Sequence, residues 1–282
     1  MKGIIFTAHH KGDRSIDIFK KYFCPIHVGS ALSDLDLGIM RDDSGINISE
    51  KNKNYCELTA SYYALKNIDS EYFGLMHYRR FFLKKSFSFQ DIKSFLKYCS
   101  YRFLGIFSIL NLNLYLDNSI YLSNYLEFKK QASLFSSFFS GECSSEIDIF
   151  LPKKVKYAYL NVKQQYSINH CMHQFELFNE IILKKYPFFT DSIRKVNASK
   201  KIYPYNMYIM KKEYFFEYNS MLFDVLEDME EKVSLDFMGP YQSRVFGFLS
   251  ERFLNYYIEM LSVRSNVNIK ELRTAFVRDE AL

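Results

Sequence analysis

Polar and ionisable side chains gather at three places in the first third of the chain, next to apolar runs of strand length. The three clusters are His9-His10-Lys11 with Asp13, the segment Arg41 to Ser49, and His77-Tyr78-Arg79-Arg80. In open α/β sheets, ligands bind outside the carboxyl ends of the strands. The spacing therefore predicts one ligand site, built from these clusters at one edge of a sheet.

Arg79 and Arg80 carry the clearest ligand chemistry. Two adjacent guanidinium groups after an apolar strand, with His77 and Tyr78 before them, can hold a pyrophosphate. Guanidinium forks match phosphate oxygens in pairs and do not lose their charge. The spacing fits two other roles equally well: a solvated pair on the surface, or an ion pair with the aspartate-rich segment 31–54.

The segment 31–54 is rich in aspartate and lacks helical periodicity, so we expect a long loop. Loops of this length inside a compact domain are usually functional. Asp42 and Asp43 could ligate a divalent metal, or they could turn the loop. We favour the loop role, or a contact with a sugar hydroxyl, over a metal.

Amide and hydroxyl side chains follow these two aspartates. Asn47, Ser49 and Asn52 suit a sugar, whose hydroxyls need both donors and acceptors. The alternative is helix capping, either by Ser49 or by Asn54 together with Glu57. The two roles are compatible.

Glu251 is the candidate for proton transfer. It lies beside the apolar stretch Gly247 to Leu254, where burial can raise the pKa of a carboxyl and make it a general base. A salt bridge or a helix-terminal carboxylate is the alternative. His170 and His173 lie one helical turn apart without an evident third ligand, which favours a core or capping role over a metal site.

Strands and helices alternate along the chain, which predicts an α/β fold with a mainly parallel central sheet flanked by helices. The expected strands cover residues 2–8, 26–28, 72–76, 147–152 and 208–211. The expected helices cover residues 55–67, 89–98, 162–185, 213–233 and 244–261. The polar tail from Asn268 is expected to dock or fray.

Residues 97–146 differ in composition from the rest, with many Phe, Tyr, Leu, Ser and Asn and few charges. They predict a helical, aromatic-rich insertion within a single domain that covers residues 1–282. A segment of about 50 residues cannot bury so many rings by itself. The rings either pack on the main domain or across a homodimer, or they face a membrane or an acceptor.

The composition is that of a folded globule, with 282 residues, 48% hydrophobic and 24% charged. The net charge of +5 fits an anionic ligand or a lipid surface and does not demand nucleic acid. The five cysteines are scattered without a C-x-x-C pair, which argues against a zinc site and a disulfide scaffold. Without a signal peptide or a membrane-length apolar run, we expect a cytoplasmic protein, with peripheral contact at the inner face of the membrane as an option.

Several blocks of the chain look familiar. Two are highly specific: Asp42-Asp43-Ser44-Gly45-Ile46-Asn47-Ile48-Ser49-Glu50-Lys51-Asn52 with the following segments 55–59 and 63–67, and Gly74-Leu75-Met76-His77-Tyr78-Arg79-Arg80-Phe81. More modest blocks cover residues 148–152, 206–211 and 247–252. Together they resemble a bacterial family long labelled a domain of unknown function, whose members sit among capsular and O-antigen polysaccharide synthesis proteins. The resemblance implies a glycosyltransferase with a GT-A-like nucleotide-sugar fold, and one relative is a galactofuranosyltransferase domain.

The resemblance also implies a reaction. A sugar, galactofuranose or galactose, would move from a nucleotide-diphosphate donor, with a UDP-sugar favoured, to a lipid-linked or growing surface polysaccharide. The displacement would be inverting. It would also need no metal, because His77-Tyr78-Arg79 follows the strand at which ordinary GT-A enzymes carry Asp-x-Asp. Mg or Mn on Asp42 and Asp43 is the alternative. The rival functions are a non-catalytic glycan-binding component of an assembly complex and another phosphate-ester enzyme.

Each candidate residue receives a role under this resemblance. Donor binding falls to His9, Lys11, Asp42, Asp43, Asn47, Ser49, Asn52, Glu57, His77, Tyr78, Arg79 and Arg80. Arg244 and Arg252 would bind the acceptor. Glu251 would deprotonate the acceptor hydroxyl, with Asp236 as the reserve.

Overall fold

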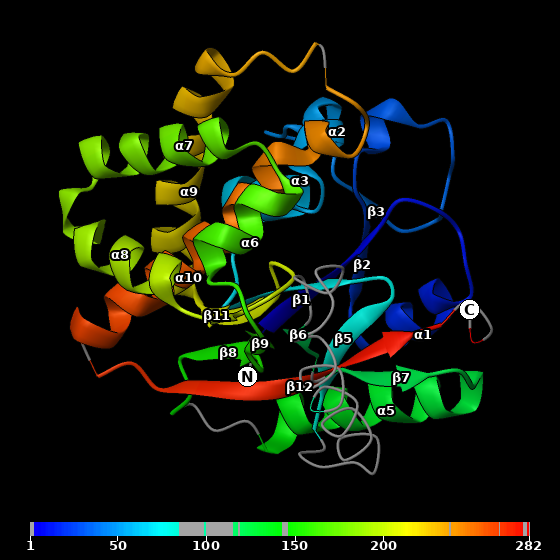
Figure 1. Ribbon diagram of the computed structural model, residues 1–282. Helices are drawn as coiled ribbons and strands as arrows, with labels where there is room; N and C mark the ends of the chain where they lie inside the picture. The colour runs from blue at the N-terminus through cyan, green and yellow to red at the C-terminus, as the bar shows by residue number, and fades with distance from the viewer. Residues whose placement is uncertain are drawn as a thin grey trace.

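A mixed β-sheet lies at the centre of the molecule, with helices on both of its faces (Figure 1). The computed structural model describes residues 3–84, 99, 115–117, 119–142, 146–236, 238–264, 266–278 and 281. The fold is α/β, as the alternation of strands and helices predicts.

The first four strands form the parallel part of the sheet. They are β1 (Gly3–His9), β2 (Cys24–His27), β3 (Met40–Arg41) and β4 (Tyr72–His77), in the order β3-β2-β1-β4. β1 and β4 are apolar runs buried on both faces, which is the pattern of central parallel strands. Because these strands are parallel, their carboxyl ends meet at one edge of the sheet.

The other strands make the rest of the sheet mixed. They are β5 (Arg80–Leu83), β7 (Ile120–Leu122), β8 (Ile149–Pro152), β11 (Tyr208–Lys211) and β12 (Ile269–Val277). β11 runs antiparallel to β4 and β8, whereas β12 runs antiparallel to β5 and parallel to β7 and β8. The pairings β4-β11-β8-β12-β5 close on β4 to form a ring of five strands. The expectation of a mainly parallel sheet is wrong for this half, because β4 turns directly back into β5 as a hairpin.

Two helical layers cover the sheet. The larger layer holds α2 (Asn52–Tyr55), α3 (Leu58–Asn67), α6 (Val162–Asn169), α7 (Met172–Lys185), α8 (Thr190–Ala198), α9 (Lys212–Lys232) and α10 (Val245–Arg264), and the smaller holds α1 (Ser15–Tyr22) and α5 (Tyr125–Ser137). Alternate residues of β4 point to opposite layers: Phe73 and Leu75 join the larger core, and Tyr72 and Met76 the smaller one. A small second sheet pairs β10 (Lys201–Ile202), β9 (Val155–Tyr157) and β6 (Tyr115–Leu116).

Most predicted elements are confirmed to within a few residues, and two differ clearly. The helix expected over residues 162–185 is two helices, α6 and α7, separated at His170 and Cys171. The tail expected to dock or fray is the strand β12, which is central to the ring. Arg273 and Thr274 are buried in β12, and these polar residues obscure its strand pattern. The helix expected over residues 89–98 lies outside the described residues.

The described part of segment 97–146 is not helical throughout, because it contributes β6 and β7 as well as α5. Phe128 and Phe135 on α5 are fully buried against α1 and the sheet. These two rings therefore pack on the main domain, which is one of the alternatives that the sequence predicts. Among the described residues, no helix is long and apolar enough to cross a membrane.

Candidate active site

A cavity of about 800 Å³ opens at the carboxyl ends of β1, β2 and β4. Its walls come from these strand ends, from the junction of α2 and α3, and from the segment that precedes α10. The lining residues are Ala8, His10, Val28, Asn52, Lys53, Cys56, Glu57, His77, Tyr78, Met238, Pro240, Ser243 and Arg244. The cavity lies at the edge of the sheet where parallel-strand topology predicts a ligand.

The strand register sets two walls side by side. Ala8 on β1 pairs with His77 on β4, so the residues that follow these positions, His10 and Tyr78, reach the same space. The ring of His10 meets the ring of Tyr78 edge-on at 5.0 Å. Together these side chains form an aromatic, polar floor.

The junction of α2 and α3 is held open by a backbone turn at Cys56, which has a φ of 53°. A left-handed residue stops α2 and redirects the chain into α3. The Cys56 thiol accepts a hydrogen bond from Arg244 Nε at 3.1 Å, which ties this junction to the segment before α10. Gly29 has a φ of 68°, and the Asn52 side chain occupies the space that a Cβ on Gly29 would need.

Cations outnumber carboxylates in the cavity wall. Lys53 and Arg244 are basic side chains, whereas Glu57 is the one carboxylate among the described lining residues. Burial, helped by the neighbouring Lys11, lowers the pKa of His10. The wall as a whole favours an anionic ligand.

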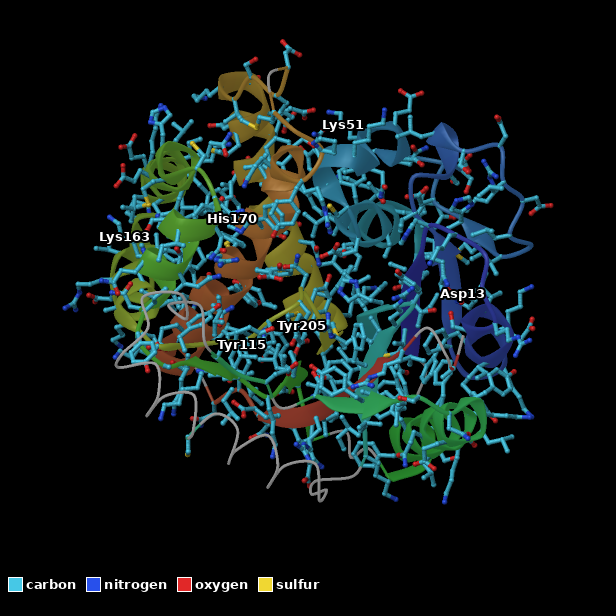
Figure 2. The ribbon with its side chains drawn as sticks, turned by 45° about the vertical axis from the view of Figure 1, so that its right-hand side comes forward. Asp13, Lys51, Tyr115, Lys163, His170 and Tyr205 are labelled. Carbon is cyan, nitrogen blue, oxygen red and sulfur yellow. The ribbon has the colours of Figure 1, made fainter. Side chains whose placement is uncertain are left out.

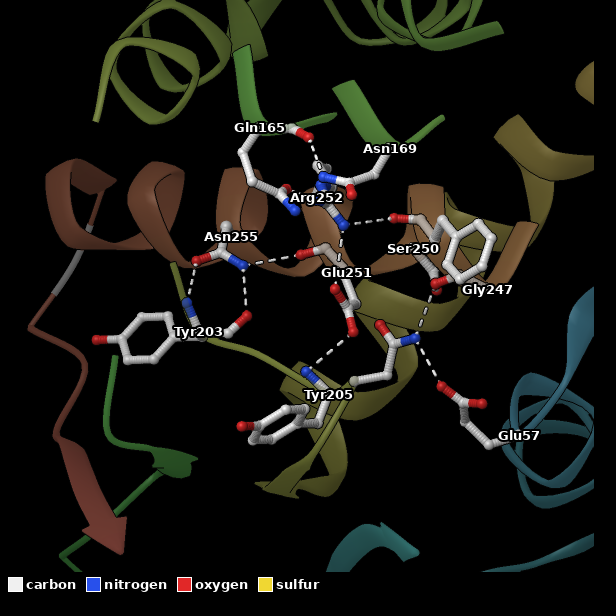
Figure 3. Close-up of polar contacts among 12 residues, drawn as sticks. Glu57, Gln165, Asn169, Tyr203, Tyr205, Gly247, Ser250, Glu251, Arg252 and Asn255 are labelled. Carbon is white, nitrogen blue, oxygen red and sulfur yellow. Dashed lines mark hydrogen bonds and ion pairs between the residues drawn. The ribbon is translucent and has the colours of Figure 1, made fainter. Parts of the chain in front are cut away.

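Behind this wall, the turn Tyr205–Asn206 joins the cavity to Glu251 (Figure 3). His77 Nε2 donates to the Tyr205 carbonyl at 2.6 Å, and the Tyr205 N–H donates to Glu251 Oε1 at 3.1 Å. Asn206 Nδ2 donates to Glu57 Oε1 at 2.8 Å and to the Gly247 carbonyl at 3.0 Å. Tyr205 and Asn206 have φ values of 77° and 52°. Non-glycine residues in this region cost energy and concentrate at functional sites.

Glu251 does not itself line the cavity, and 27% of its side chain is exposed to solvent. Its Oε2 pairs with Arg252 Nη1 at 3.0 Å. Burial raises the pKa of the Glu251 carboxyl and Glu57 adds to the rise, although Arg252 opposes it. A carboxylate with a raised pKa is a stronger base than an ordinary one.

Five of the predicted site residues line the cavity: Asn52, Glu57, His77, Tyr78 and Arg244. Asn52 also stabilises the α2–α3 junction, because its Nδ2 donates to the Cys56 carbonyl at 2.7 Å. Arg244 was assigned to the acceptor, yet it lies in the same wall as the donor candidates.

Residues Arg41 to Ser49 do not line the cavity, and their polar side chains serve the fold. Asp42 is fully buried and accepts hydrogen bonds from the Gly29 N–H, from Ser30 and from the Ser49 hydroxyl. Neither Asp42 nor Ser49 is therefore accessible to a donor sugar. The structure corrects the donor-binding role predicted for them.

Two further loop residues bond within the loop itself. Arg41 binds Asp43 through two nitrogens, and this hydrogen bonding lowers the pKa of the Asp43 carboxyl. Asn47 Oδ1 accepts from the Ser49 N–H at 3.1 Å. These contacts are local turn chemistry, and neither residue lines the cavity.

The arginine pair also differs from its prediction. The Arg80 guanidinium stacks over the Tyr205 ring at 3.7 Å and near Phe276 at 5.0 Å, which holds it within the fold. Arg79 lies against the Tyr78 ring at 5.1 Å, and so does Lys11 at 5.7 Å. None of these three cations lines the cavity.

Three other candidates occupy different surroundings. His9 is fully buried, and burial lowers its pKa to about 4. Arg252 is 3% exposed and bonds Gln165, Glu251 and the Phe248 carbonyl, so the acceptor role predicted for it is corrected to a structural one. Asp236 is exposed and outside the cavity wall.

Besides Ala8, His10 and Val28 at the ends of β1 and β2, the predicted site omitted Lys53, Cys56, Met238, Pro240 and Ser243, which also line the cavity. Lys53 and Cys56 lie within or beside the blocks that carry the resemblance, and that position was a usable signal. The other three come from the chain before α10, and no spacing along the sequence links them to the strand ends. Among the described residues, no three His, Cys, Asp or Glu side chains are grouped as a metal ion requires.

Comparison with known proteins places this site in a family. The family model described as a domain of unknown function, DUF4422, matches residues 4–262, which include the whole cavity wall and Glu251. The chain belongs to the DUF4422 family.

A solved structure is similar to this DUF4422 chain over nearly its full length. The apo structure of WbbM, described as a bifunctional glycosyltransferase, superposes with a TM-score of 0.79 and 29% sequence identity over 99% of this chain. The DUF4422 chain spans 46% of the WbbM chain. No curated protein matches its sequence.

Proposed function

We propose that this DUF4422 protein is a glycosyltransferase with a GT-A-like site, which binds a nucleotide-diphosphate sugar in the cavity at the ends of β1, β2 and β4. The observation that carries the proposal is the cavity itself. It has about 800 Å³, lies at a parallel-strand edge, and has cations and an aromatic floor in its wall. The similarity to WbbM supports the same reaction class.

The leaving group explains the charges of the wall. As the bond between sugar and phosphate breaks, negative charge builds on the nucleotide diphosphate. Lys53 and Arg244 stabilise that charge, and His77 donates its Nε2 hydrogen to Tyr205 rather than to the ligand. This assignment replaces Arg79 and Arg80, which are not among the residues that line the cavity.

Glu251 is the proposed base. Its carboxylate takes the proton of the acceptor hydroxyl, the hydroxyl oxygen forms a bond to the anomeric carbon, and the bond from that carbon to the diphosphate breaks. A single displacement of this kind inverts the anomeric configuration. The raised pKa and the partial exposure of Glu251 support the assignment.

The finer assignments rest on the family resemblance. The donor is UDP-galactofuranose or UDP-galactose, and the acceptor is a lipid-linked or growing surface polysaccharide of capsule or O-antigen synthesis. The reaction needs no metal, and the protein works at the cytoplasmic face of the membrane.

The test measures UDP release and UDP binding with the purified protein. We expect wild-type protein to release UDP from UDP-galactofuranose or UDP-galactose in the presence of a membrane lipid extract. Glu251→Gln should reduce turnover by about 100-fold or more, as loss of a general base does, and leave UDP affinity unchanged.

Glu259→Gln is the matched control, since Glu259 lies on the same helix α10 and pairs with Lys195 instead. It should retain full turnover. Equal turnover in Glu251→Gln would remove Glu251 from the mechanism. A wild-type protein that neither binds UDP nor consumes the donor would favour the glycan-binding function.

A further inference from the structure

A second polar cluster surrounds Asp117, at the hydroxyl end of the Tyr205 side chain. Asp117 Oδ1 accepts from the Ser119 N–H at 2.9 Å and from the Tyr205 hydroxyl at 3.3 Å. Asp117 Oδ2 accepts from the Tyr121 hydroxyl at 3.1 Å. The carboxylate is thus fixed in place between β6 and β7.

Tyr205 connects this carboxylate to the proposed base. Its N–H donates to Glu251 and its hydroxyl donates to Asp117, so the two carboxylates lie at opposite ends of one tyrosine. The Arg80 guanidinium, 3.7 Å from the centre of the ring, fixes the orientation of that tyrosine. The Asp117 cluster therefore has a defined position relative to Glu251.

Exposed aromatic rings surround Asp117. Tyr115 is 47% exposed and Tyr121 is 40% exposed, whereas most aromatic side chains in the described part of the chain are buried. Tyr115 packs against Tyr157 with ring centroids 6.3 Å apart, and it pairs with Tyr157 in the small second sheet. Figure 2 shows Tyr115 and Tyr205 in the same part of the molecule.

These groups match the chemistry of a sugar. The hydroxyls of a sugar donate hydrogen bonds, and an ionised carboxylate has about four acceptor sites, of which Asp117 uses three within the protein. The C–H face of a sugar ring is apolar and packs on an exposed aromatic ring. A carboxylate fixed among exposed tyrosines provides both contacts together.

We propose that Asp117, Tyr115 and Tyr121 form a subsite for the acceptor sugar, one tyrosine away from Glu251. This inference rests on the proposed function, because it gives the cluster the acceptor side of that reaction. Tyr115 packs on the sugar face, Asp117 accepts from a sugar hydroxyl, and the reacting hydroxyl points toward Glu251.

The test uses simple glycosides as probes. Methyl glycosides of galactose, glucose, mannose and N-acetylglucosamine are titrated into the full chain and followed by saturation-transfer NMR, and UDP is titrated separately by calorimetry. We expect at least one glycoside to bind wild-type protein. Tyr115→Ala and Asp117→Asn should each weaken that binding at least fivefold without changing UDP affinity.

Phe188→Ala is the matched control, since Phe188 is an exposed ring that packs with Tyr186 and Phe189, away from the cluster. It should bind the glycoside as wild type does. No glycoside binding to wild type, or equal binding to wild type and Tyr115→Ala, would overturn the subsite. Glycoside binding that Tyr115→Ala abolishes, without any UDP binding, would keep the subsite and overturn the transferase.

Discussion

Arg244 comes from the C-terminal half of the chain and lines the cavity. Its substitution tests whether the positive charge of the cavity wall binds the diphosphate. Arg244→Ala should weaken UDP binding by about 10- to 100-fold, the equivalent of one charge-assisted hydrogen bond. Arg244→Lys should recover only part of the loss, because an ammonium lacks the guanidinium fork. Calorimetric titration with UDP measures both. Arg264→Ala, at the last residue of α10 and paired with Glu217, is the control, and an unchanged affinity in Arg244→Ala would exclude the diphosphate role.

His9 predicts a pH dependence of stability. Burial lowers its pKa to about 4 in the folded state, against 6.5 in the unfolded chain. The unfolded chain therefore binds a proton first as the pH falls below 6.5, and stability is lost progressively down to pH 4. At pH 5 this amounts to about 2 kcal/mol relative to pH 7.

Urea unfolding at pH 7 and pH 5 checks this value. His9→Gln should lose about 2 kcal/mol less than wild type between the two pH values. His173→Gln, at an exposed position on α7, should lose as much as wild type. Identical losses in wild type and His9→Gln would show that His9 is protonated in the folded state.

Residue types alone predicted where the site lies better than which residues form it. His77, Tyr78 and Glu57 were predictable, because they follow a strand end or open a helix next to it. Asp42 was assigned to the ligand for its charge, yet its oxygens are consumed by Gly29, Ser30 and Ser49. A sequence does not reveal which polar group is already satisfied by a distant N–H.

At the scale of elements, α5 tests whether the aromatic insertion belongs to the core. Phe128→Ala should lower the free energy of unfolding by about 3–5 kcal/mol, since it leaves a cavity between α5 and α1. Leu126→Ala on the same helix is the control, because Leu126 is 72% exposed and its truncation should change stability by about 0.5 kcal/mol at most. Chemical denaturation measures both, and equal small effects would mean that α5 is not part of the core.

The elements that sequence patterns missed share a physical cause. β12 contains the buried polar residues Arg273 and Thr274, so apolar alternation does not reveal it. Only two residues, Tyr78 and Arg79, separate β4 from β5, and the sequence Arg79-Arg80 resembles an exposed loop. By contrast, β1 and β4 are short, mainly apolar runs, and their prediction needed no tertiary contact.

At the scale of the molecule, the cavity wall predicts independence from divalent metal. Lys53 and Arg244 supply positive charge, and Glu57 is the one carboxylate among its described lining residues. Turnover of the UDP-sugar should therefore persist in excess EDTA at more than half of its rate without chelator. A complete loss that manganese restores would make the metal, rather than these side chains, the partner of the diphosphate.

The ring of strands affects how the protein associates when its helical layers loosen. Because β4-β11-β8-β12-β5 closes on itself, the central strands present few free backbone groups to another molecule. In the part of the chain that the structure describes, the strands at the open ends of this sheet are β3 with two residues and β7 with three. Such short edges are poor templates for intermolecular β-pairing. Partial loosening of the helical layers should therefore lead to amorphous association rather than to fibrils.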